Sequence, residues 1–179
     1  MKKIVVFVLI LSLIILVVIQ VSGQSLKNDD MTSELNKIEH YLVHSDSINK
    51  EVSKVAVAWH LDHSLKVING ISDSLQNSDP TAYKRKFNIA RFFSFTFGFI
   101  PRGRAQSPKY VLPPDTIKTE DIVAQLSLAR DKLVALDSLD DKSNFNHPVF
   151  NQLNKQQAKK FIKIHTRHHL KIVRDILKE

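Results

Sequence analysis

The sequence predicts an all-α protein, and three observations support this fold class. Apolar residues recur at intervals of three or four through several stretches, which places them on one face of a helix. No stretch alternates apolar and polar residues in the way that a half-buried strand does. Helix-capping and helix-stopping residues such as Asp79, Pro80 and Gly98 separate the stretches. We therefore expect residues 30–179 to form a four-helix bundle with an extra helix in the crossover connection.

The five expected helices are separated by recognisable boundaries. In order, they cover residues 29–47, 52–77, 79–98, 119–136 and 154 to nearly the C-terminus. Asp79 before Pro80 is typical of an N-cap with proline at the first helical position, so the third helix is expected to begin there and to end at Gly98. Residues 100–115 hold four of the six prolines and predict an extended connection. Residues 140–153 are expected to form a second loop.

Residues 1–25 form a separate segment. Two lysines follow the first methionine and precede residues 4–19, which are apolar except for one serine. Such a segment inserts with its lysines on the cytoplasmic side, so the rest of the chain is expected outside the cytoplasm. The segment is either a membrane anchor formed by residues 4–21 or a signal peptide cleaved near Gly23. Its length and its Ile and Val content favour the anchor, which tethers the domain to the cell membrane. Cleavage would instead give a secreted or periplasmic protein.

The composition excludes several functions. The chain has no cysteine, so it has no disulfide, thiolate metal site, cysteine nucleophile or lipoprotein anchor. Any metal ion must be held by nitrogen or oxygen. The net charge is +8, from 26 Lys and Arg against 18 Asp and Glu, and it is +6 without Lys2 and Lys3 of the N-terminal segment, which favours anions or anionic lipid headgroups as partners. Phosphate-binding glycine loops and nucleic-acid motifs are absent, so no nucleic-acid partner is expected.

Histidines are the candidate functional residues. On a helical wheel, His165 and His169 of the last helix lie within its apolar stripe, with His168 toward the edge. His63 faces inward from the second helix, and His60 lies about 60° away as a substitute. Three inward-facing imidazoles supply three nitrogen ligands and leave a position open for water or substrate, as in catalytic metal sites. The alternative is a set of hydrogen-bonded core histidines without a metal.

Two further polar residues near the candidate site each have two interpretations. His147 is either a further ligand or general base, or a residue packed beside Phe145 and Phe150, which we favour. Asp62 is either an acceptor that orients a neighbouring imidazole, or a residue facing solvent from the outer face of its helix, which we favour.

Two groups of residues around the extended connection are also open to two interpretations. Arg102, Arg104 and Lys109 form either an anion-binding lip over the metal or a solvated basic loop near the membrane, and we favour the loop. A dense group of phenylalanines forms either a ligand pocket or, as we favour, part of the core: Phe92, Phe93, Phe95, Phe97 and Phe99.

Four motifs, in this order along the chain, carry a family resemblance. They are WHLDH (residues 59–63), IPRGR (100–104), HPVF (147–150) and HTRHHL (165–170). Together they resemble the DinB-like (YfiT-like) superfamily of helical-bundle metalloenzymes, and most closely its uncharacterised bacterial branch common in Bacteroidetes. The resemblance implies an all-α bundle with a divalent site of zinc or nickel type, built from the same three inward-facing histidines. It also relates the chain to thiol-dependent transferases and isomerases.

Two classes of function follow from these features. As an enzyme, the chain would be a metal-dependent transferase or hydrolase acting on an unknown small molecule, with no catalytic residue assigned. As a binding module, the same bundle would hold a metal ion or ligand at the membrane without turnover. Cytosolic thiols do not reach a domain outside the cytoplasm, which favours hydrolysis over thiol transfer. The sequence leaves a homodimer open.

Overall fold

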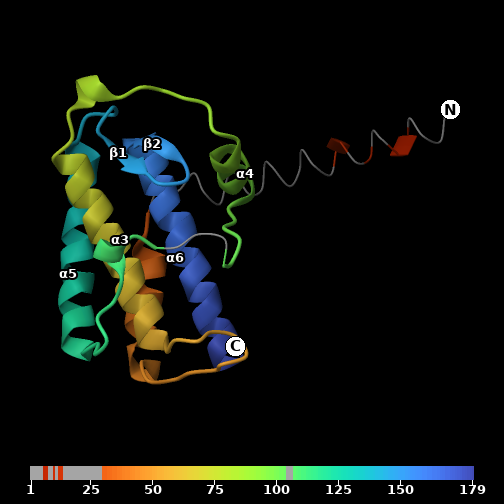
Figure 1. Ribbon diagram of the computed structural model, residues 1–179, viewed down its shortest axis with the longest axis vertical. Coiled ribbons are helices and arrows are strands. Elements are labelled where there is room, and N and C mark those ends of the chain that lie inside the picture. Colours follow the sequence, from red (N-terminus) through yellow and green to blue (C-terminus); the bar gives the residue numbers. More distant parts are fainter. Residues whose placement is uncertain (1–5, 8–9, 11, 14–29, 104–106) are drawn as a thin grey trace.

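The computed structural model describes residues 30–103 and 107–179, together with residues 6, 7, 10, 12 and 13. This part of the chain is mostly helical, as the sequence predicts, and contains one small sheet of two strands. In the numbering of Figure 1, the helices are α2 (Thr32–His40), α3 (Val57–Gln76), α4 (Ile89–Phe97), α5 (Thr119–Ala135) and α6 (Lys155–Leu177).

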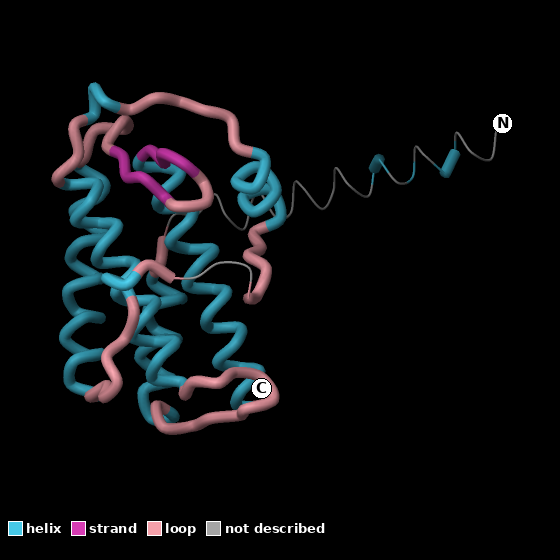
Figure 2. Tube along the Cα trace, in the orientation of Figure 1, coloured by secondary structure: helices cyan, strands magenta, loops and turns pink. Residues whose placement is uncertain are grey.

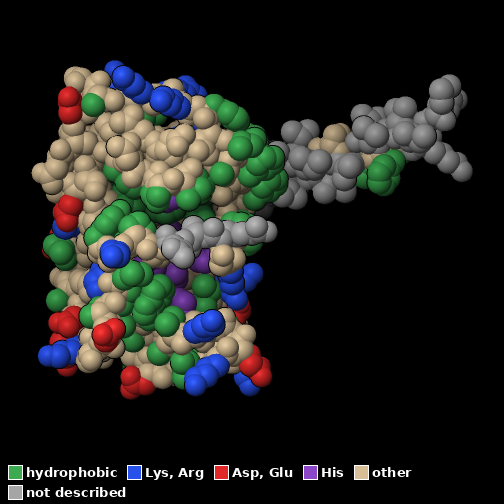
Figure 3. All heavy atoms as spheres, in the orientation of Figure 1, with side chains coloured by type: hydrophobic (Ala, Val, Ile, Leu, Met, Phe, Trp, Pro, Cys, Tyr) green, Lys and Arg blue, Asp and Glu red, His purple; other side chains and the backbone are tan. Residues whose placement is uncertain are grey.

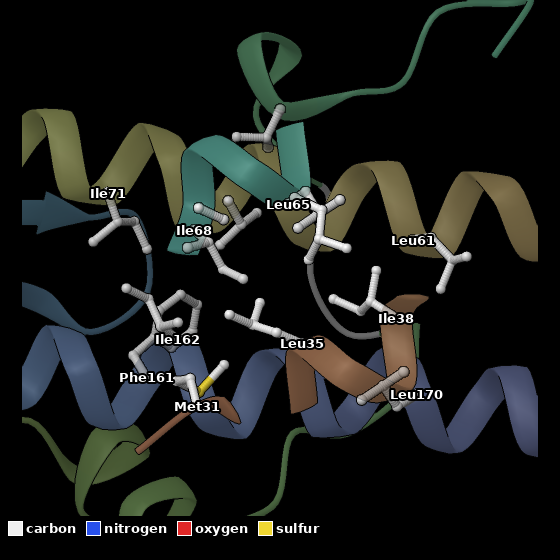
Figure 4. Close-up of a cluster of buried hydrophobic side chains, with 14 of the residues drawn as sticks. Met31, Leu35, Ile38, Leu61, Leu65, Ile68, Ile71, Phe161, Ile162 and Leu170 are labelled. Carbon is white, nitrogen blue, oxygen red and sulfur yellow. The ribbon is translucent and has the colours of Figure 1, made fainter. Parts of the chain in front are cut away.

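Helices α2, α3, α5 and α6 surround one hydrophobic core. Both α2 and α3 pack against α5 and α6, and the three longer helices run side by side in Figure 2. Figure 4 shows aliphatic side chains from these helices meeting between the ribbons. Each helix contributes a fully buried isoleucine: Ile38, Ile68, Ile122 and Ile162. Burial of one such side chain contributes about 1.5–3 kcal/mol, so this core explains the apolar spacing in the sequence.

The first two helices are shorter than the sequence predicts. α3 begins at Val57, later than the expected start at residue 52, because the Val57 amide already donates to the Ser47 carbonyl at 3.0 Å. An amide at a helix N-terminus needs such a partner from outside the helix. α2 ends at His40, and the chain continues as a 3-10 turn over Tyr41–His44.

The third predicted helix begins later than expected. Asp79 does act as an N-cap, but only for a short 3-10 turn over Pro80–Ala82. The following segment is extended because its backbone bonds to another part of the chain: the Lys84 amide donates to Gln152 Oε1 at 2.7 Å. α4 starts only after Asn88, whose side chain accepts from a backbone amide of the first turn. Gly98 ends the helix in the left-handed region, as predicted.

α4 meets the rest of the molecule on one side only. The Arg91 guanidinium donates to the carbonyls of Lys86, Phe150 and Gln152, and the Phe95 ring packs edge-on against Phe150 at 5.7 Å. The remaining phenylalanines of this region, which we expected in the core, are exposed: Phe92, Phe93, Phe97 and Phe99. The prediction of core packing is wrong for these four residues, because nothing in the described chain covers the outer face of α4.

The predicted loop 140–153 contains a β-hairpin. Strands β1 (Asn144–His147) and β2 (Asn151–Asn154) pair antiparallel, with His147 opposite Asn151. The expectation of no strand is therefore wrong here. These four-residue strands, in which half of the residues are asparagine, are too short to carry a clear alternation of apolar and polar residues, which explains the error. Asn151 has a φ of 61°, a conformation that asparagine tolerates better than most residues.

His147 packs within this hairpin, as the favoured interpretation expects. Its Nδ1 accepts hydrogen bonds from the amides of Val149 and Phe150, both at 3.1 Å. Its ring stacks on Phe150 at 4.6 Å and meets Phe161 of α6 at 4.4 Å. Burial lowers the pKa of His147 from 6.5 to about 4. The ring is therefore uncharged at neutral pH, and its proton is on Nε2 because Nδ1 is an acceptor.

The expected anchor or signal segment, residues 1–25, lies outside the described residues except at isolated positions. Across the described part of the chain, no helix combines the length and the apolar character needed to span a membrane.

We predict that the folded state loses stability as the pH falls from 6.5 to 5. Burial holds the pKa of His60 and of His147 at about 4, against 6.5 in the unfolded chain. The unfolded state therefore binds more protons in this window, and acid favours it. Denaturant unfolding in the presence of a chelator should show a loss of about 1.5 kcal/mol for each of these histidines between pH 6.5 and 5.

The matched variant is His147→Asn. The asparagine Oδ1 can accept from the same two amides but does not titrate, so the pH-dependent loss should shrink by about 1.5 kcal/mol. An unchanged pH dependence in this variant would contradict the role given to His147.

Candidate metal centre

Three histidines from two helices meet inside the bundle. His63 lies on α3, and His165 and His169 lie one turn apart on α6. Each offers one ring nitrogen, and these nitrogens lie within 4.8 Å of one another. The ring centroids are separated by 4.6 to 5.1 Å. The structure thus brings together the three residues that the helical wheels select.

The donor set fits a divalent metal ion. Imidazole nitrogen suits both zinc and nickel, and two nitrogens bound to one zinc ion lie about 3.3 Å apart. Small ring rotations would therefore close the group around an ion. His165 Nδ1 is buried and has no hydrogen-bond partner among the described residues. Burial lowers the pKa of all three histidines, so their rings are uncharged at neutral pH and keep a lone pair.

A backbone carbonyl fixes the tautomer of His63. Its Nδ1 lies 2.8 Å from the carbonyl oxygen of Val111. Since a carbonyl oxygen only accepts, Nδ1 must carry the proton and donate it. The lone pair is then on Nε2, which lies 3.4 Å from Ser107 Oγ. His63 therefore presents Nε2 as its ligand atom.

A chain of hydrogen bonds connects His169 to Ser53 through His60. Ser53 Oγ lies 3.1 Å from the Val55 carbonyl oxygen and 3.0 Å from His60 Nε2, and when its one proton goes to the carbonyl it accepts from His60 Nε2. His60 Nδ1 then has no proton and accepts from His169 Nδ1, also at 3.0 Å. Burial lowers the pKa of His60 to about 4, which keeps it in this uncharged acceptor form. The lone pair of His169 is consequently on Nε2.

Trp59 forms one wall of the centre. Its ring stacks on His63 with centroids 4.9 Å apart and also lies near His169, at 6.2 Å. This stacking follows from the spacing, since residues four apart in a helix are neighbours on its surface. Histidine side chains are visible from outside in Figure 3, within a hollow between hydrophobic side chains. His63 and His169 themselves are buried, at 2% and 8% exposed.

The other histidines named from the sequence lie outside the three-nitrogen group. His60 contacts His169 as an outer partner, and His147 packs in the hairpin. His168 is half-buried and hydrogen-bonds the backbone of Ile100. Burial first, and then the charge of Arg102, lower its pKa.

Asp62 lies in neither of its expected environments. The side chain is buried rather than exposed to solvent, and it accepts from Gln125 Nε2 of α5 at 2.7 Å. It also pairs with Lys66 at 2.8 Å. The solvent-facing expectation is wrong because α5 covers this face of α3, which the periodicity of one helix cannot reveal. Asp62 thus links two helices and makes no hydrogen bond to an imidazole.

The basic residues of the extended connection lie in different environments. Arg102 is close enough to lower the pKa of His60 and His168, yet its guanidinium pairs with Asp175. Lys109 is exposed, and Arg104 lies outside the described residues.

Sequence reasoning did not identify the hydrogen-bond partners that orient the imidazoles of His63 and His169. The Val111 carbonyl carries no sequence signal, because every residue has one. Ser53 precedes α3, and only the observed bend of the chain brings it to His60.

Comparison of the chain with family models, with curated proteins and with solved structures finds no match.

Proposed function

We propose that the chain binds one divalent metal ion, of zinc or nickel type, through His63, His165 and His169. The observation that carries this proposal is the meeting of three uncharged imidazoles with ligand nitrogens within 4.8 Å of one another. The hydrogen bonds at Nδ1 of His63 and His169 support it, because metal-binding histidines commonly donate their second ring N–H to an acceptor. The resemblance to the DinB-like superfamily supports the same site.

The proposed activity is that of a DinB-like metal-dependent transferase or hydrolase acting on a small molecule. Three protein ligands leave further coordination positions open, as in catalytic sites. A metal ion supplies Lewis acidity, which lowers the pKa of a thiol or water molecule bound to it. The chain itself holds the rings: Val111 and His60 keep protons off the ligand nitrogens, and Trp59 covers one side of the centre.

A second candidate function is metal or ligand binding without turnover. One observation favours it: no Asp or Glu of the described residues joins the histidine group. Without a neighbouring carboxylate, the centre has no side chain of that kind to act as a general base. A bundle that only holds a metal ion needs none.

We also propose that the domain lies outside the cytoplasm, tethered to the cell membrane by residues 4–21. The two lysines before this apolar run support that orientation. Release after cleavage near Gly23 is the alternative. In either location the cysteine-free chain meets no cytosolic thiol, which supports water as the nucleophile over a thiol.

The metal site is tested by measuring bound metal and metal affinity for the purified full chain. We expect one equivalent of zinc or nickel, and at least about 100-fold weaker binding after His63→Ala, because one of three ligands is lost. Trp59 is the sole tryptophan and stacks on His63, so its fluorescence reports nickel binding directly. The matched control is His40→Ala, which removes an exposed histidine of α2. Equal metal content in all three proteins would exclude His63 from the site.

The hydrogen bond between His60 and His169 gives a second test of the metal site. We expect His60→Ala to weaken metal binding about 10- to 100-fold, because His169 loses the acceptor that places its lone pair on Nε2. Metal titration at constant pH measures this change, and circular dichroism checks the fold. Wild-type affinity in a folded His60→Ala protein would contradict the tautomer assignment of His169.

Cell fractionation tests the location. The full-length protein should be recovered with membranes, and a version lacking residues 1–24 should stay soluble, because the apolar run is then missing. Intact full-length protein in the cytosol would overturn the proposed topology and favour thiol transfer.

A further inference from the structure

Helix α4 and its flanks expose an aromatic surface that the histidine centre does not use. Five phenylalanines, each at least 50% exposed, form what we call the α4 patch: Phe87, Phe92, Phe93, Phe97 and Phe99. Their rings contact one another, for example Phe93 and Phe97, which stack at 6.1 Å. In Figure 3, hydrophobic side chains gather over α4. A group of exposed aromatic side chains in mutual contact typically marks an interaction site.

The α4 patch is held outward by the fold. Arg91 is buried, and its guanidinium donates to the carbonyls of Lys86, Phe150 and Gln152. Phe95 packs against Phe150 beneath the helix. These contacts fix the inner side of α4, so the phenylalanines of the α4 patch cannot turn into the core without breaking them.

Charge is concentrated on the same part of the chain. Residues 80–114 contain seven Lys or Arg and no Asp or Glu, so they carry seven of the eight net positive charges. Lys84, Arg85 and Lys86 are exposed and lie two residues before the start of α4. Lys84 and Lys86 bond other residues through backbone atoms, so these hydrogen bonds do not engage their side chains. Figure 3 shows basic side chains along the top of the molecule, where this loop runs.

We propose that the α4 patch and the basic loop 84–86 together dock on the surface of an anionic lipid bilayer. A helix with aromatic residues on one face and adjacent lysines and arginines is suited to the membrane interface. The phenyl rings enter the boundary between headgroups and acyl chains, and the cations contact anionic headgroups. A second copy of the chain fits this surface poorly, because two such copies would bring their positive charges together.

This docking is independent of the histidine centre, with which the α4 patch shares no residue. It is also distinct from an N-terminal anchor, because it concerns how the folded domain lies against the bilayer. An experiment on this docking must therefore measure contact between α4 and the bilayer.

The absence of cysteine allows a single-site label. The full chain carrying Phe93→Cys is labelled with an environment-sensitive fluorophore and mixed with vesicles of phosphatidylcholine and phosphatidylglycerol in equal amounts. We expect the emission to shift to the blue and to be quenched by nitroxide-bearing lipids. The same label on Val134→Cys, an exposed position on α5, should show neither effect.

Matched charge variants test the role of the loop. Combined Lys84→Gln, Arg85→Gln and Lys86→Gln should weaken docking of the label about 100-fold, since each cation near an anionic surface contributes roughly fivefold. Lys37→Gln, Lys50→Gln and Lys54→Gln remove the same charge from exposed positions elsewhere and should leave docking unchanged. Lack of lipid quenching at Phe93→Cys, equal quenching on pure phosphatidylcholine, or a concentration-dependent dimer that protects the label would each overturn the proposal.

Discussion

The packing of α3 against α6 buries imidazoles, and much of the surrounding structure follows from keeping those rings uncharged. A buried polar group without a partner costs about 1–3 kcal/mol, and a buried charge costs more. Two of the three central rings meet this requirement through Nδ1, at Val111 and His60. The third, His165, has a buried Nδ1 without such a partner. An interior arranged in this way directs nitrogen lone pairs toward one point, which is the property that a metal site requires.

Helix periodicity was sufficient to predict which residues meet, because the core is built from helix faces. Ile68 of α3 and Ile162 of α6 are buried as their spacing indicates, and the same wheels place His63, His165 and His169 together. Helix periodicity does not predict which element packs against the opposite face of a helix. Asp62 was assigned to solvent because the sequence of α3 contains no information about where α5 packs.

The errors in the predicted helix and strand boundaries share one physical cause. In each case the backbone forms hydrogen bonds to residues outside its own element. The segment before α4 is extended because Lys84 bonds Gln152, and α3 starts late because Val57 bonds Ser47. The hairpin forms from strands whose asparagines have little strand propensity. Local propensity cannot anticipate these partners. The hydrogen-bond acceptors that orient the histidines could not be predicted for the same reason, since a backbone carbonyl such as that of Val111 has no residue-specific signal.

The exposed phenylalanines show how a failed core prediction can indicate a function. Aromatic density in a sequence predicts burial, and burial needs an element to cover it. Arg91 fixes α4 by bonds to carbonyls beneath the helix, so the outer rings remain outside the core of this domain. The charges of residues 80–114 are all of one sign, whereas the rest of the chain is nearly neutral. An apolar face beside the exposed cations of residues 84–86 is complementary to a surface that is apolar inside and anionic outside, which describes a bilayer better than a protein core.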